Sequence, residues 1–574
     1  MIPDKPRDLF LQEGPDGVQV YLEGRPLLGR APSLSQRRRV PSSPQQQTLY
    51  LVLSPLLGYG LDAFVRSLPR SSAVLAVELD SRLGAIRDQR PPLPDPFRFV
   101  VTPEGAVTVA EELVRVRGIR RVETVSLSGG TRLHRSQYAL IEAAITEGVE
   151  RYWRNRGTEI RLGRRWISNI WRNAAIPARS AAEITPPEGI LPADGDTSIT
   201  VAGGIDRDEN RNRLLLLGAG PNLDRHLPYL KRLLRDVGTR RPVFVALDTA
   251  LPALAASGIP VDAVVAMDGQ LANATDLVPW RWSDTALFAD LTVHPSILRH
   301  FPGDRRFLFA TRFGAVSFFA DREVEPLAGL GDALPILPPR GSVAPAALEI
   351  LTVYFGFSSI VLAGTDFWYR PPRTHAAMTG GHRAFLRTHT RLAGNDGDPR
   401  VMLRPWSIET LPDGRSTPAD AILVVQARHL SDTITDLRRR KELSVHRLDG
   451  PAIPIGVPEI SRHAFREWFV AAEDDVSRFR RRLERLGAPH LRTPHLHEAF
   501  KRLSAQERVL ADTSRPPFLD AGLEFAWFDL PQWPLAGRSR EWAVLQRFRI
   551  LRAVRDHRRR LGRILSEVTP QDSL

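Results

Sequence analysis

A glycine-rich segment, GAGPNL (218–223), directly follows a run of leucines and precedes an amphipathic stretch. Glycines at such a turn let the backbone approach an anion, and the first turn of the following helix offers N–H groups without an intrahelical partner. This order of residues fits a phosphate cradle, although a simple tight turn has the same pattern. The candidate anion-binding residues are Gly218, Gly220, Pro221 and Asn222.

The same segment lacks the marks of two better-known nucleotide loops. Leu223 stands where a dinucleotide-binding fingerprint needs its third glycine. No Gly-Lys-Ser or Gly-Lys-Thr follows, so the segment is not a Walker loop. Any phosphate bound here would therefore be held by the backbone and by groups from other segments.

Polar side chains also follow the next two apolar runs. Asp248 closes VFVAL, and Asp268 and Gln270 follow AVVAM. Because parallel strands bring their carboxyl ends to the same edge of a sheet, we expect these groups to line one ligand site with the glycine segment. The alternative is that Asp248 only caps the helix that follows it.

The segments RGSVA (340–344) and GTDFWY (364–369) carry further candidates. Gly341 and Ser342 open a helix, where a serine can cap backbone N–H groups or hydrogen-bond a phosphate or carboxylate. Asp366 ends an apolar run beside aromatic residues that could stack on a base or a sugar. His375 follows in a loop and could act as a general base, because the pKa of histidine lies near neutral pH.

Two more histidines, His382 and His389, raise the alternative of a metal site. The spacing between successive histidines is seven residues (382 − 375 and 389 − 382), which matches no common pattern of metal ligands. We therefore predict that the chain needs neither a metal nor a bound cofactor.

The elements that must position these residues alternate between strands and helices. The runs RLLLL, VFVAL and SIVLA read as buried strands, and DRHLPYLKRLLRDVG (224–238) is an amphipathic helix that ends at a glycine. This alternation predicts a mainly parallel sheet in a Rossmann-like α/β catalytic domain over residues 201–460.

Three further segments complete the predicted organisation. Residues 1–180 form an N-terminal domain, in which a polar lead-in and loop to about residue 45 precede a doubly wound α/β unit and a helix with Trp166, Ile170 and Trp171 on one face. Residues 181–200, rich in Pro, Gly and Asp, are the predicted linker. Beyond residue 460, charged amphipathic stretches replace strands, so 461–574 is predicted to be a helical C-terminal domain.

Composition excludes several classes of protein. The 574 residues, 43% hydrophobic and 25% charged, are typical of a globular protein with more than one domain. With no cysteine, a disulfide framework and a thiolate metal site are excluded. No apolar run reaches the roughly 20 residues needed to cross a membrane, and charges occupy the place of a signal peptide's apolar region, so we expect a cytoplasmic protein without a membrane association.

The net charge of +14 comes almost entirely from arginine. Its short basic runs, at 37–39, 438–441, 480–482 and 558–560, are most simply solvated faces of helices and loops. Neither a zinc-finger spacing nor an aromatic RNA-binding signature is present, so we do not expect nucleic-acid binding. An anionic nucleotide donor or an acidic substrate would suit a basic protein equally well.

Taken in order, several segments resemble the motility accessory factor (Maf) proteins, the flagellin glycosyltransferases. They are GAGPNL, VALDTALPALAASGIPVDAVVAMDGQ, RGSVAPAALEILTVYFGFSSIVLAGTDFWY and THA, followed by LDGPAIPIGVPEI. The helix RRWISNIWRNAA and the N-terminal LLGYGLDAF and VLAVELD segments are similar to further parts of that family, so the resemblance covers most of residues 45–460. The central unit is also similar to bacterial sialyltransferases that use CMP-activated sugars.

The resemblance implies transfer of a nonulosonic acid, of the pseudaminic or legionaminic type, from its CMP donor to Ser or Thr of flagellin or another surface protein. The glycine segment would then cradle the phosphate and ribose of the donor, and Ser342 would contact the phosphate or the sugar carboxylate. Asp248, Asp268 and Gln270 would line the nucleotide or sugar pocket. His375 would deprotonate the acceptor hydroxyl, with Asp366 as the second catalytic residue.

This chain departs from the pattern at two places. The histidine of the sialyltransferases lies farther downstream, nearer His389, and Asn222 replaces the usual serine. The chemistry also needs positive charge or hydrogen-bond donors beside the departing CMP phosphate, for which Arg340 is a candidate.

Three alternatives stay open. Archaeal pterin pyrophosphokinases share the Gly-Pro loop and the strand-end aspartates, but they are shorter and use ATP with Mg²⁺. In the N-terminal unit, LLGYG with Glu78 and Asp80 looks like a methyltransferase nucleoside pocket, for which a degenerate scaffold is the simpler interpretation. The chain could also be a non-catalytic basic adaptor that holds flagellin or nucleic acid. The sequence leaves the oligomeric state open, a homo-oligomer included.

Overall fold

The structure, a computed structural model, describes most of the chain between residues 9 and 568. The residues outside the description are 1–8, 89–90, 181–211, 239, 278–279, 312–333, 371–372, 389–406, 411–413, 415, 486–492, 515–516, 518, 520–522, 524–525, 527–538 and 569–574. The chain divides into two compact units: unit 1 contains Met1–Arg164 and Ala505–Asp556, and unit 2 contains Arg165–Ser504 and His557–Leu574. The predicted linker 181–200 lies outside the described residues.

Unit 1 begins with a three-stranded antiparallel sheet of β1 (Leu9–Gly14), β2 (Gly17–Leu22) and β3 (Arg25–Pro26). The prediction of a lead-in and loop up to residue 45 is therefore wrong for this segment. A short turn joins β1 to β2, and Val20 and Leu22, alternate residues on one face of β2, are buried. This alternation of apolar residues was the sequence signal for a strand that the prediction did not use.

The second sheet of unit 1 has four strands in the order β6-β5-β4-β7, and each described pairing is parallel. Its strands are β4 (Thr48–Leu53), β5 (Ala73–Val77), β6 (Phe97–Val100) and β7 (Arg121–Ser126). Its helices are α1 (Pro32–Arg37), α2 (Leu61–Ser67), α3 (Ser81–Asp88) and α4 (Pro103–Arg117), with the 3-10 turn η1 (Gly129–Arg132). Since β7 returns to the opposite side of β4 from β5, the strand order reverses between β4 and β7.

Helix α5 (Arg135–Ala174) is a single helix of 40 residues that contributes to both units. In unit 1 it buries Tyr138, Ile141 and Ile145 against the sheet. In unit 2 its last turns bury Ile170 and Trp171. The predicted domain limit at residue 180 thus differs from the division by contacts at Arg164, which lies inside the helix.

Unit 2 is built on a ten-stranded sheet in the order β14-β13-β12-β11-β10-β9-β15-β18-β19, with β8 beside β13. Its strands are β8 (Arg179–Ser180), β9 (Arg213–Leu217), β10 (Val243–Leu247), β11 (Ala263–Ala266), β12 (Ala286–Asp290), β13 (Arg306–Thr311), β14 (Ile336–Leu337), β15 (Ser359–Ala363), β18 (Ser444–Leu448) and β19 (Glu459–Ile460). The described pairings of this sheet are parallel, as predicted. The chain runs outward from β9 to β14 and then places β15 on the other side of β9, so the strand order reverses between β9 and β15.

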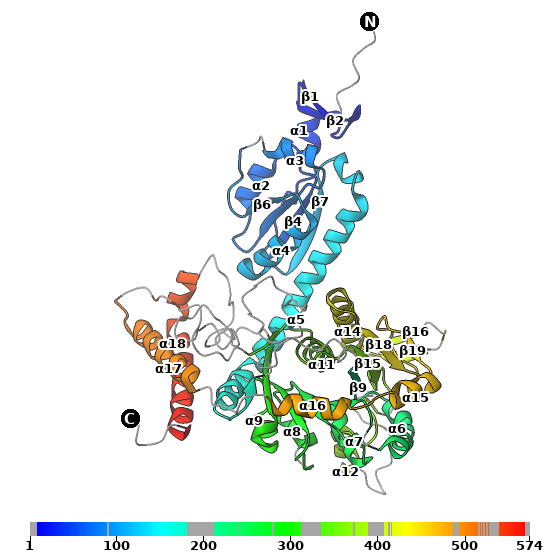
Figure 1. The fold of residues 1–574 in the computed structure, drawn as a ribbon. Coiled ribbons are helices and arrows are strands. Elements are labelled where there is room, and N and C mark those ends of the chain that lie inside the picture. Colours follow the sequence, from blue (N-terminus) through cyan, green and yellow to red (C-terminus); the bar gives the residue numbers. More distant parts are fainter. Residues whose placement is uncertain are drawn as a thin grey trace. The chain divides into compact units, whose positions relative to one another are not determined.

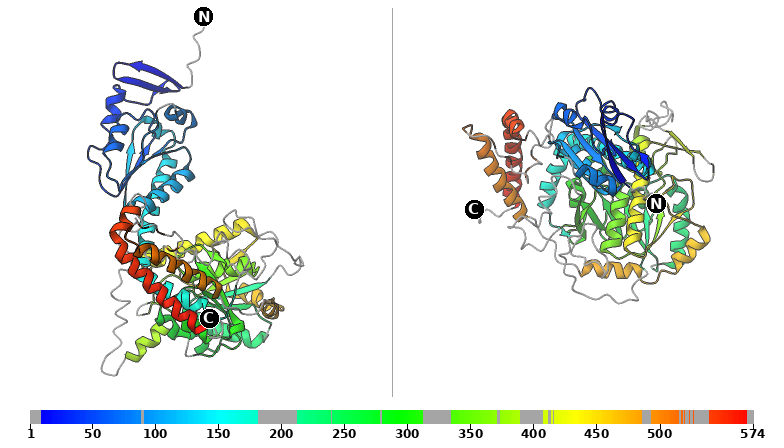
Figure 2. Two further views of the ribbon diagram at one scale, coloured as in Figure 1. Left: turned by 90° about the vertical axis from the view of Figure 1, so that its left-hand side faces the viewer. Right: turned by 90° about the horizontal axis from the view of Figure 1, so that it is seen from above.

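Helices cover both faces of this sheet (Figures 1 and 2). They are α6 (Leu223–Val237), α7 (Leu251–Ala256), α8 (Leu271–Leu277), α9 (Pro295–His300), α11 (Val343–Glu349), α12 (Gly380–Thr388), α14 (Ala421–Arg440), α15 (Arg462–Val470) and α16 (Asp475–Glu484). Shorter elements are η4 (Asp248–Ala250), η5 (Gly303–Arg305), the π-helical turn η7 (Ile350–Tyr354) and the hairpin of β16 (Ser407–Thr410) and β17 (Ser416–Ala419). The predicted α/β fold class is confirmed.

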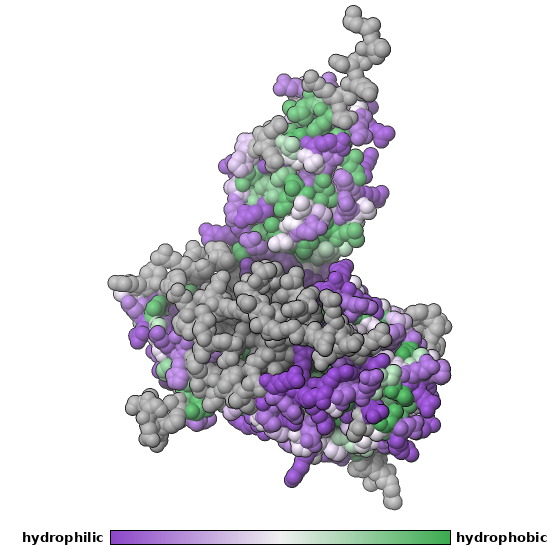
Figure 3. Space-filling model, in the orientation of Figure 1, coloured by the Kyte–Doolittle hydropathy of each residue, from purple (hydrophilic) through white to green (hydrophobic). Residues whose placement is uncertain are grey.

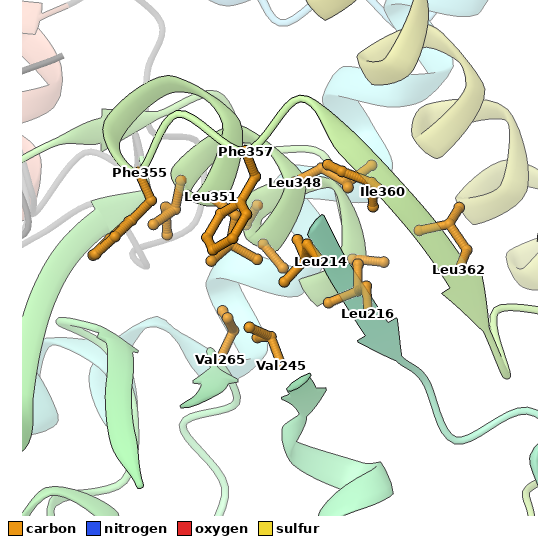
Figure 4. Close-up of a cluster of buried hydrophobic side chains, with 14 of the residues drawn as sticks. Leu214, Leu216, Val245, Val265, Leu348, Leu351, Phe355, Phe357, Ile360 and Leu362 are labelled. Carbon is orange, nitrogen blue, oxygen red and sulfur yellow. The ribbon is translucent and has the colours of Figure 1, made fainter. Parts of the chain in front are cut away.

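The main core of unit 2 lies between one face of the sheet and helices α11, α14 and α16. Figure 4 shows its centre, where side chains of β9, β10, β11 and β15 meet Leu348, Leu351 and Phe355. Helix α16 adds Phe479 to the same cluster, and burial of one such ring stabilises the fold by about 1.5–3 kcal/mol. The C-terminal segment is helical as predicted, but its start at residue 461 does not separate it from unit 2.

The remaining C-terminal helices are α17 (Thr493–Ala511) and α18 (Ser539–Val568). Within the described part of the chain, no helix combines the length and the apolarity that a membrane span requires.

Two of the basic runs hold helix ends and turns in place. On α16, whose surface is hydrophilic in Figure 3, Arg482 donates hydrogen bonds to the carbonyl oxygens of Tyr354 and Phe355 at 2.9 and 2.7 Å. Lys441 donates to the carbonyl of Gly356 at 3.1 Å, and burial lowers the pKa of this lysine to about 8. Cations near a helix C-terminus neutralise its partial negative charge, so these residues have a structural role.

Candidate functional site

A cleft lies at the carboxyl ends of β9, β10 and β15, where the strand order of unit 2 reverses. Ligands of open α/β sheets bind at this kind of position. The cleft has an empty volume of about 660 Å³, which includes space open to solvent. Its lining comes from residues 218–220, 247–249, 342–344, 364–368 and 374–375, with Leu423 and Gln426 of α14.

The cleft brings together just over half of the residues predicted from the sequence. Those that line it are Gly218, Gly220, Asp248, Ser342, Asp366 and His375. Those outside the lining are Pro221, Asn222, Asp268, Gln270 and Gly341. Reasoning from the sequence assigned no role to Thr365, Leu423 and Gln426, whereas Thr249 and Trp368 stood in segments already recognised. Thr365 adjoins Asp366, whereas Leu423 and Gln426 lie on a helix, α14, that carried no signal.

The glycine segment is pressed against the loop that follows β15. Gly218 donates its N–H to the carbonyl of Ala363 at 2.7 Å, and Gly220 donates to Gly364 at 2.6 Å. A Cβ atom on Gly218 would lie 2.4 Å from the Gly364 oxygen, and one on Gly220 would lie 2.4 Å from an oxygen of Asp366. Contacts this short are sterically forbidden, so only glycine fits at either position.

Asp366, a predicted catalytic residue, holds this loop. Its buried carboxylate accepts the backbone N–H of Asn222 at 2.6 Å. Burial raises the pKa of Asp366 to about 7, although the hydrogen bond from Asn222 and the charge of Arg447 act in the opposite direction. The amide of Asn222 donates to the carbonyl of Pro451 at 2.8 Å, so it fixes the closing glycine-rich segment. The geometry therefore gives both side chains a positioning role.

Asp248 lines the cleft but also bonds locally. Its carboxylate accepts the N–H of Thr249 at 2.8 Å and the Thr249 hydroxyl at 3.3 Å. Neither η4 nor α7 has a side-chain cap, so Asp248 does not cap the helix that follows it. Burial raises the pKa of Asp248 to about 6, and the nearby charge of Asp268 raises it further.

Asp268 and Gln270 follow β11, two strands from β9, and bond to each other. The N–H of Gln270 lies 2.8 Å from one oxygen of Asp268, and the Gln270 amide nitrogen lies 3.3 Å from the other. Helix α5 holds this turn from outside, because the amide of Asn169 donates to the carbonyls of Gly269 and Thr292 at 3.0 and 2.9 Å. The asparagine-containing helix recognised in the sequence thus supports the strand ends.

The loop that carries His375 is fastened to the glycine segment. Ala376 donates its N–H to the carbonyl of Ala219 at 2.8 Å. Asp224, in the first turn of α6, accepts the N–H of Ala377 at 2.7 Å and pairs with Arg373 at 2.8 Å. These contacts place His375 at the rim of the cleft, where its Nδ1 lies 2.9 Å from the Thr374 hydroxyl.

The other two histidines do not join His375 in a site. His382 accepts the N–H of Met378 through Nδ1 at 3.1 Å, and burial lowers the pKa of His382. His389 lies outside the described residues. Among the residues that the structure describes, no group of three or more His, Asp or Glu side chains is arranged to hold a metal ion.

Arg340, the expected source of positive charge beside the phosphate, does not line the cleft. Arg340 pairs with Asp436 at 2.9 Å, and no arginine or lysine is found among the described lining residues. Neighbouring Ser342 precedes α11 without capping it, and its buried Oγ has no hydrogen-bond partner among the described residues. The same holds for Thr365 Oγ1 and Trp368 Nε1. The cleft therefore offers hydrogen-bond donors in place of cations.

The corresponding position in unit 1, beyond β4, β5 and β7, is filled by side chains. Glu78 accepts hydrogen bonds from the hydroxyls of Ser54 and Tyr138 at 2.8 and 3.1 Å, and Ser128 donates to Ser54 at 2.8 Å. Glu78 is only 1% exposed, and burial raises the pKa of its carboxyl. Its neighbour Asp80 is held by two side-chain hydrogen bonds from Arg82. Glu78 is thus committed to the protein interior, which favours the degenerate-scaffold interpretation over a methyltransferase pocket.

Comparison with known proteins finds similarity to a family model, to a bacterial protein and to a solved structure. Residues 203–371 match the family described as 6-hydroxymethylpterin diphosphokinase MptE-like. An uncharacterized protein of Treponema pallidum (strain Nichols) is 26% identical over 400 residues, which cover 67% of this chain and 63% of that protein. The chain thus spans less than two thirds of that relative's length. The solved structure of the Maf glycosyltransferase from Magnetospirillum magneticum AMB-1 is 12% identical, with a TM-score of 0.56, and the match covers 98% of this chain and 92% of that one.

The structural match extends over both units and the C-terminal helices, whereas the MptE-like match is confined to the central segment. The chain therefore has the fold of a Maf glycosyltransferase over almost its entire length, and the resemblance to the Maf proteins found in the sequence is confirmed.

Proposed function

We propose that the chain is a glycosyltransferase and that the cleft between β9 and β15 binds a CMP-activated sugar. One observation carries the proposal: segments far apart in the sequence, each selected for its ligand-binding chemistry, converge on a single cleft where the strand order reverses. The Maf fold supports the same reaction class. The charge of the donor's phosphate suits a cleft in which buried hydroxyl groups and the indole N–H of Trp368 can donate hydrogen bonds.

In its finer form, the proposal is that the donor sugar is a nonulosonic acid and the acceptor a Ser or Thr of flagellin or another surface protein. The reaction would take place in the cytoplasm and need no cofactor beyond the CMP-sugar. These points come from the resemblance of the motifs and are open to direct test.

The proposed chemistry assigns each group one task. Gly218 and Gly220 hold the loop beside the donor phosphate through their bonds to the segment after β15, and the hydroxyl of Ser342 donates a hydrogen bond to that phosphate. His375 removes the proton from the acceptor hydroxyl, whose oxygen bonds to the anomeric carbon of the sugar. The bond between that carbon and the phosphate oxygen breaks, and CMP leaves with the electron pair. If Nδ1–H of His375 donates to the Thr374 hydroxyl, Nε2 is the basic nitrogen.

Ligand binding by the full chain tests the nucleotide assignment. We expect CMP to raise the thermal midpoint, and AMP and S-adenosylmethionine to raise it much less. A larger shift with S-adenosylmethionine than with CMP would contradict the proposal and revive the methyltransferase alternative. No shift with any of the three would favour the adaptor alternative.

Transfer is tested with His375→Ala. Loss of a general base lowers kcat by about 10²- to 10⁴-fold, while CMP affinity should stay unchanged. The matched control is His463→Ala on α15, because the side chain of His463 is 85% exposed and the residue does not line the cleft. In cells, the intact mass of flagellin should fall in a strain that lacks the gene, and an unchanged mass would remove flagellin as the acceptor.

The MptE-like match over residues 203–371 favours a second candidate, an ATP-dependent pterin diphosphokinase. Such an enzyme would need ATP with Mg²⁺, and the match leaves unit 1 and the C-terminal helices unexplained. The two candidates separate in one measurement: ATP and a hydroxymethylpterin should give a Mg²⁺-dependent thermal shift only if the second is right.

A further inference from the structure

Three side chains of the cleft carry hydrogen-bonding atoms without a partner among the described residues: Ser342 Oγ, Thr365 Oγ1 and Trp368 Nε1. Buried polar groups are nearly always hydrogen-bonded, because leaving one unpaired costs stability. Their gathering at one cleft is therefore informative.

Thr365 is the sharpest case, because no part of the preceding assignment uses it. The residue is only 4% exposed and lies between two groups that hold the glycine loop, Gly364 and Asp366. Its methyl carbon is close to Gly218, since a Cβ built on that glycine would lie 3.0 Å from it. Thr365 thus packs against the predicted phosphate loop while its hydroxyl remains unsatisfied.

Valine is branched at Cβ like threonine and has nearly the same shape, so it would fill this space without an unpaired hydroxyl. The unpaired hydroxyl therefore lowers the stability of the ligand-free protein, and a hydrogen bond to a ligand could restore that stability. Because Cβ of threonine carries both a hydroxyl and a methyl group, rotation about χ1 changes which of the two faces the cleft. A ligand oxygen arriving there would give the hydroxyl its missing acceptor.

We infer that Thr365 is a ligand-binding residue whose hydroxyl donates a hydrogen bond to a phosphate oxygen of the nucleotide. This assignment rests on the proposed function, because the proposed CMP-sugar supplies that phosphate. A phosphate oxygen suits this position because it can accept several hydrogen bonds at once, and Ser342, Thr365 and Trp368 each offer a donor that has no other acceptor among the described residues.

The test is Thr365→Val in the full chain, with two readouts. We expect its affinity for CMP to fall about tenfold, as for loss of a hydrogen bond to a charged group, while its affinity for cytidine, which has no phosphate, stays unchanged. The free variant should melt about 2 to 4 °C higher than the wild type, because a stranded polar group has been removed.

Thr352→Val is the matched control. The hydroxyl of Thr352, in the turn η7, is also buried and unpartnered among the described residues, but the residue does not line the cleft. This variant should melt higher as well, yet bind CMP like the wild type. If only Thr365→Val loses affinity for CMP while both variants melt higher, the difference between them must come from contact of Thr365 with the ligand.

Two outcomes would overturn the inference. If Thr365→Val binds CMP as tightly as the wild type, the hydroxyl does not meet the phosphate. If it melts lower and loses CMP and cytidine equally, the hydroxyl has a structural role. Failure of the proposed function looks different, because the wild type itself would then not bind CMP. In that case the same variant is scored on ATP, and unchanged ATP binding would overturn the inference too.

Discussion

Units 1 and 2 each contain a parallel sheet in which the strand order reverses, between β4 and β7 in one and between β9 and β15 in the other. In unit 2, a cleft is lined by glycines and by buried hydrogen-bonding atoms that have no partner in the part of the chain that the structure describes. In unit 1, the same topological position is closed by Ser54, Glu78, Ser128 and Tyr138, which hydrogen-bond one another. Topology alone therefore marks where a ligand could bind, and we expect the pairing of the polar side chains to decide whether one does.

The two units are also expected to differ in how their buried polar groups affect stability. A satisfied buried network stabilises its unit, whereas unpaired buried hydroxyls destabilise theirs until a ligand arrives. Unit 1 would then serve as a scaffold, and unit 2 would carry the chemistry. We therefore expect variants in unit 1 to lower stability without changing ligand affinity, and variants in unit 2 to change ligand affinity.

The largest effect is expected for Gly220→Ala. The new Cβ would lie 2.4 Å from Asp366 and 2.7 Å from the carbonyl of Gly364, so the glycine loop and the strand loop must move apart. We expect a loss of about 1–3 kcal/mol of stability and loss of measurable CMP binding, read by calorimetry. The control is Gly303→Ala, where the added atom meets nothing within 4 Å. Undiminished CMP binding by Gly220→Ala would show that the loop is not part of the site.

The counterpart in unit 1 is Gly130→Ala. Its Cβ would lie 2.2 Å from the hydroxyl oxygen of Ser54, so the network around Glu78 must open. We expect unit 1 to lose about 1–3 kcal/mol, seen as faster hydrogen exchange in β4 and β5, while CMP affinity stays at the wild-type value. Gly157→Ala on α5 is the control, since nothing lies within 4 Å of its added atom. A drop in CMP affinity with Gly130→Ala would contradict the division of roles.

A smaller effect concerns pH. Burial raises the pKa of Asp248 to about 6, so its carboxyl is neutral below that pH and negative above it. An anion in the cleft should bind more weakly once Asp248 is charged, by about three- to tenfold. The probe is the methyl ester of CMP, whose single phosphodiester charge stays constant over about pH 5 to 8. Asp248→Asn should remove the step near pH 6 and leave the step near pH 7 that belongs to Asp366, which lines the same cleft. A variant that keeps the step near pH 6 would place Asp248 away from the bound phosphate.

The sequence predicted most of the features that depend on local order. Alternating apolar and amphipathic runs indicate parallel strands, and the residue after each strand falls at the ligand edge, so Gly218, Asp248 and Asp366 could be placed in advance. Asn222 was predicted to face the ligand, but its amide meets Pro451, 229 residues away in the chain. No local pattern encodes such a partner.

The hairpin near the N-terminus and the α14 part of the cleft show two further limits. The polar character of residues 1–45 and the Pro, Ser and Gln near their end indicated a lead-in and loop, although the alternation within β2 was visible. Gln426 reaches the cleft only because α14 packs on α11 across the core. A single sequence gives the period of a helix but not the neighbour against which its exposed end lies.

The smallest effect is expected for variants of Asp224, which lies between the phosphate loop and the loop that carries His375. Asp224 joins α6 to that second loop through the N–H of Ala377 and through Arg373. Asp224→Asn keeps an acceptor for the N–H but loses the ion pair, which is partly exposed and contributes at most about 1 kcal/mol. We expect kcat to fall only a few-fold with CMP affinity unchanged, and Asp224→Ala to lower kcat further. Asp236→Ala, on the same helix and loosely paired with Arg466 at 4.0 Å, should change neither quantity. If CMP affinity falls in Asp224→Asn while kcat holds, Asp224 supports the donor site and not the placement of the base.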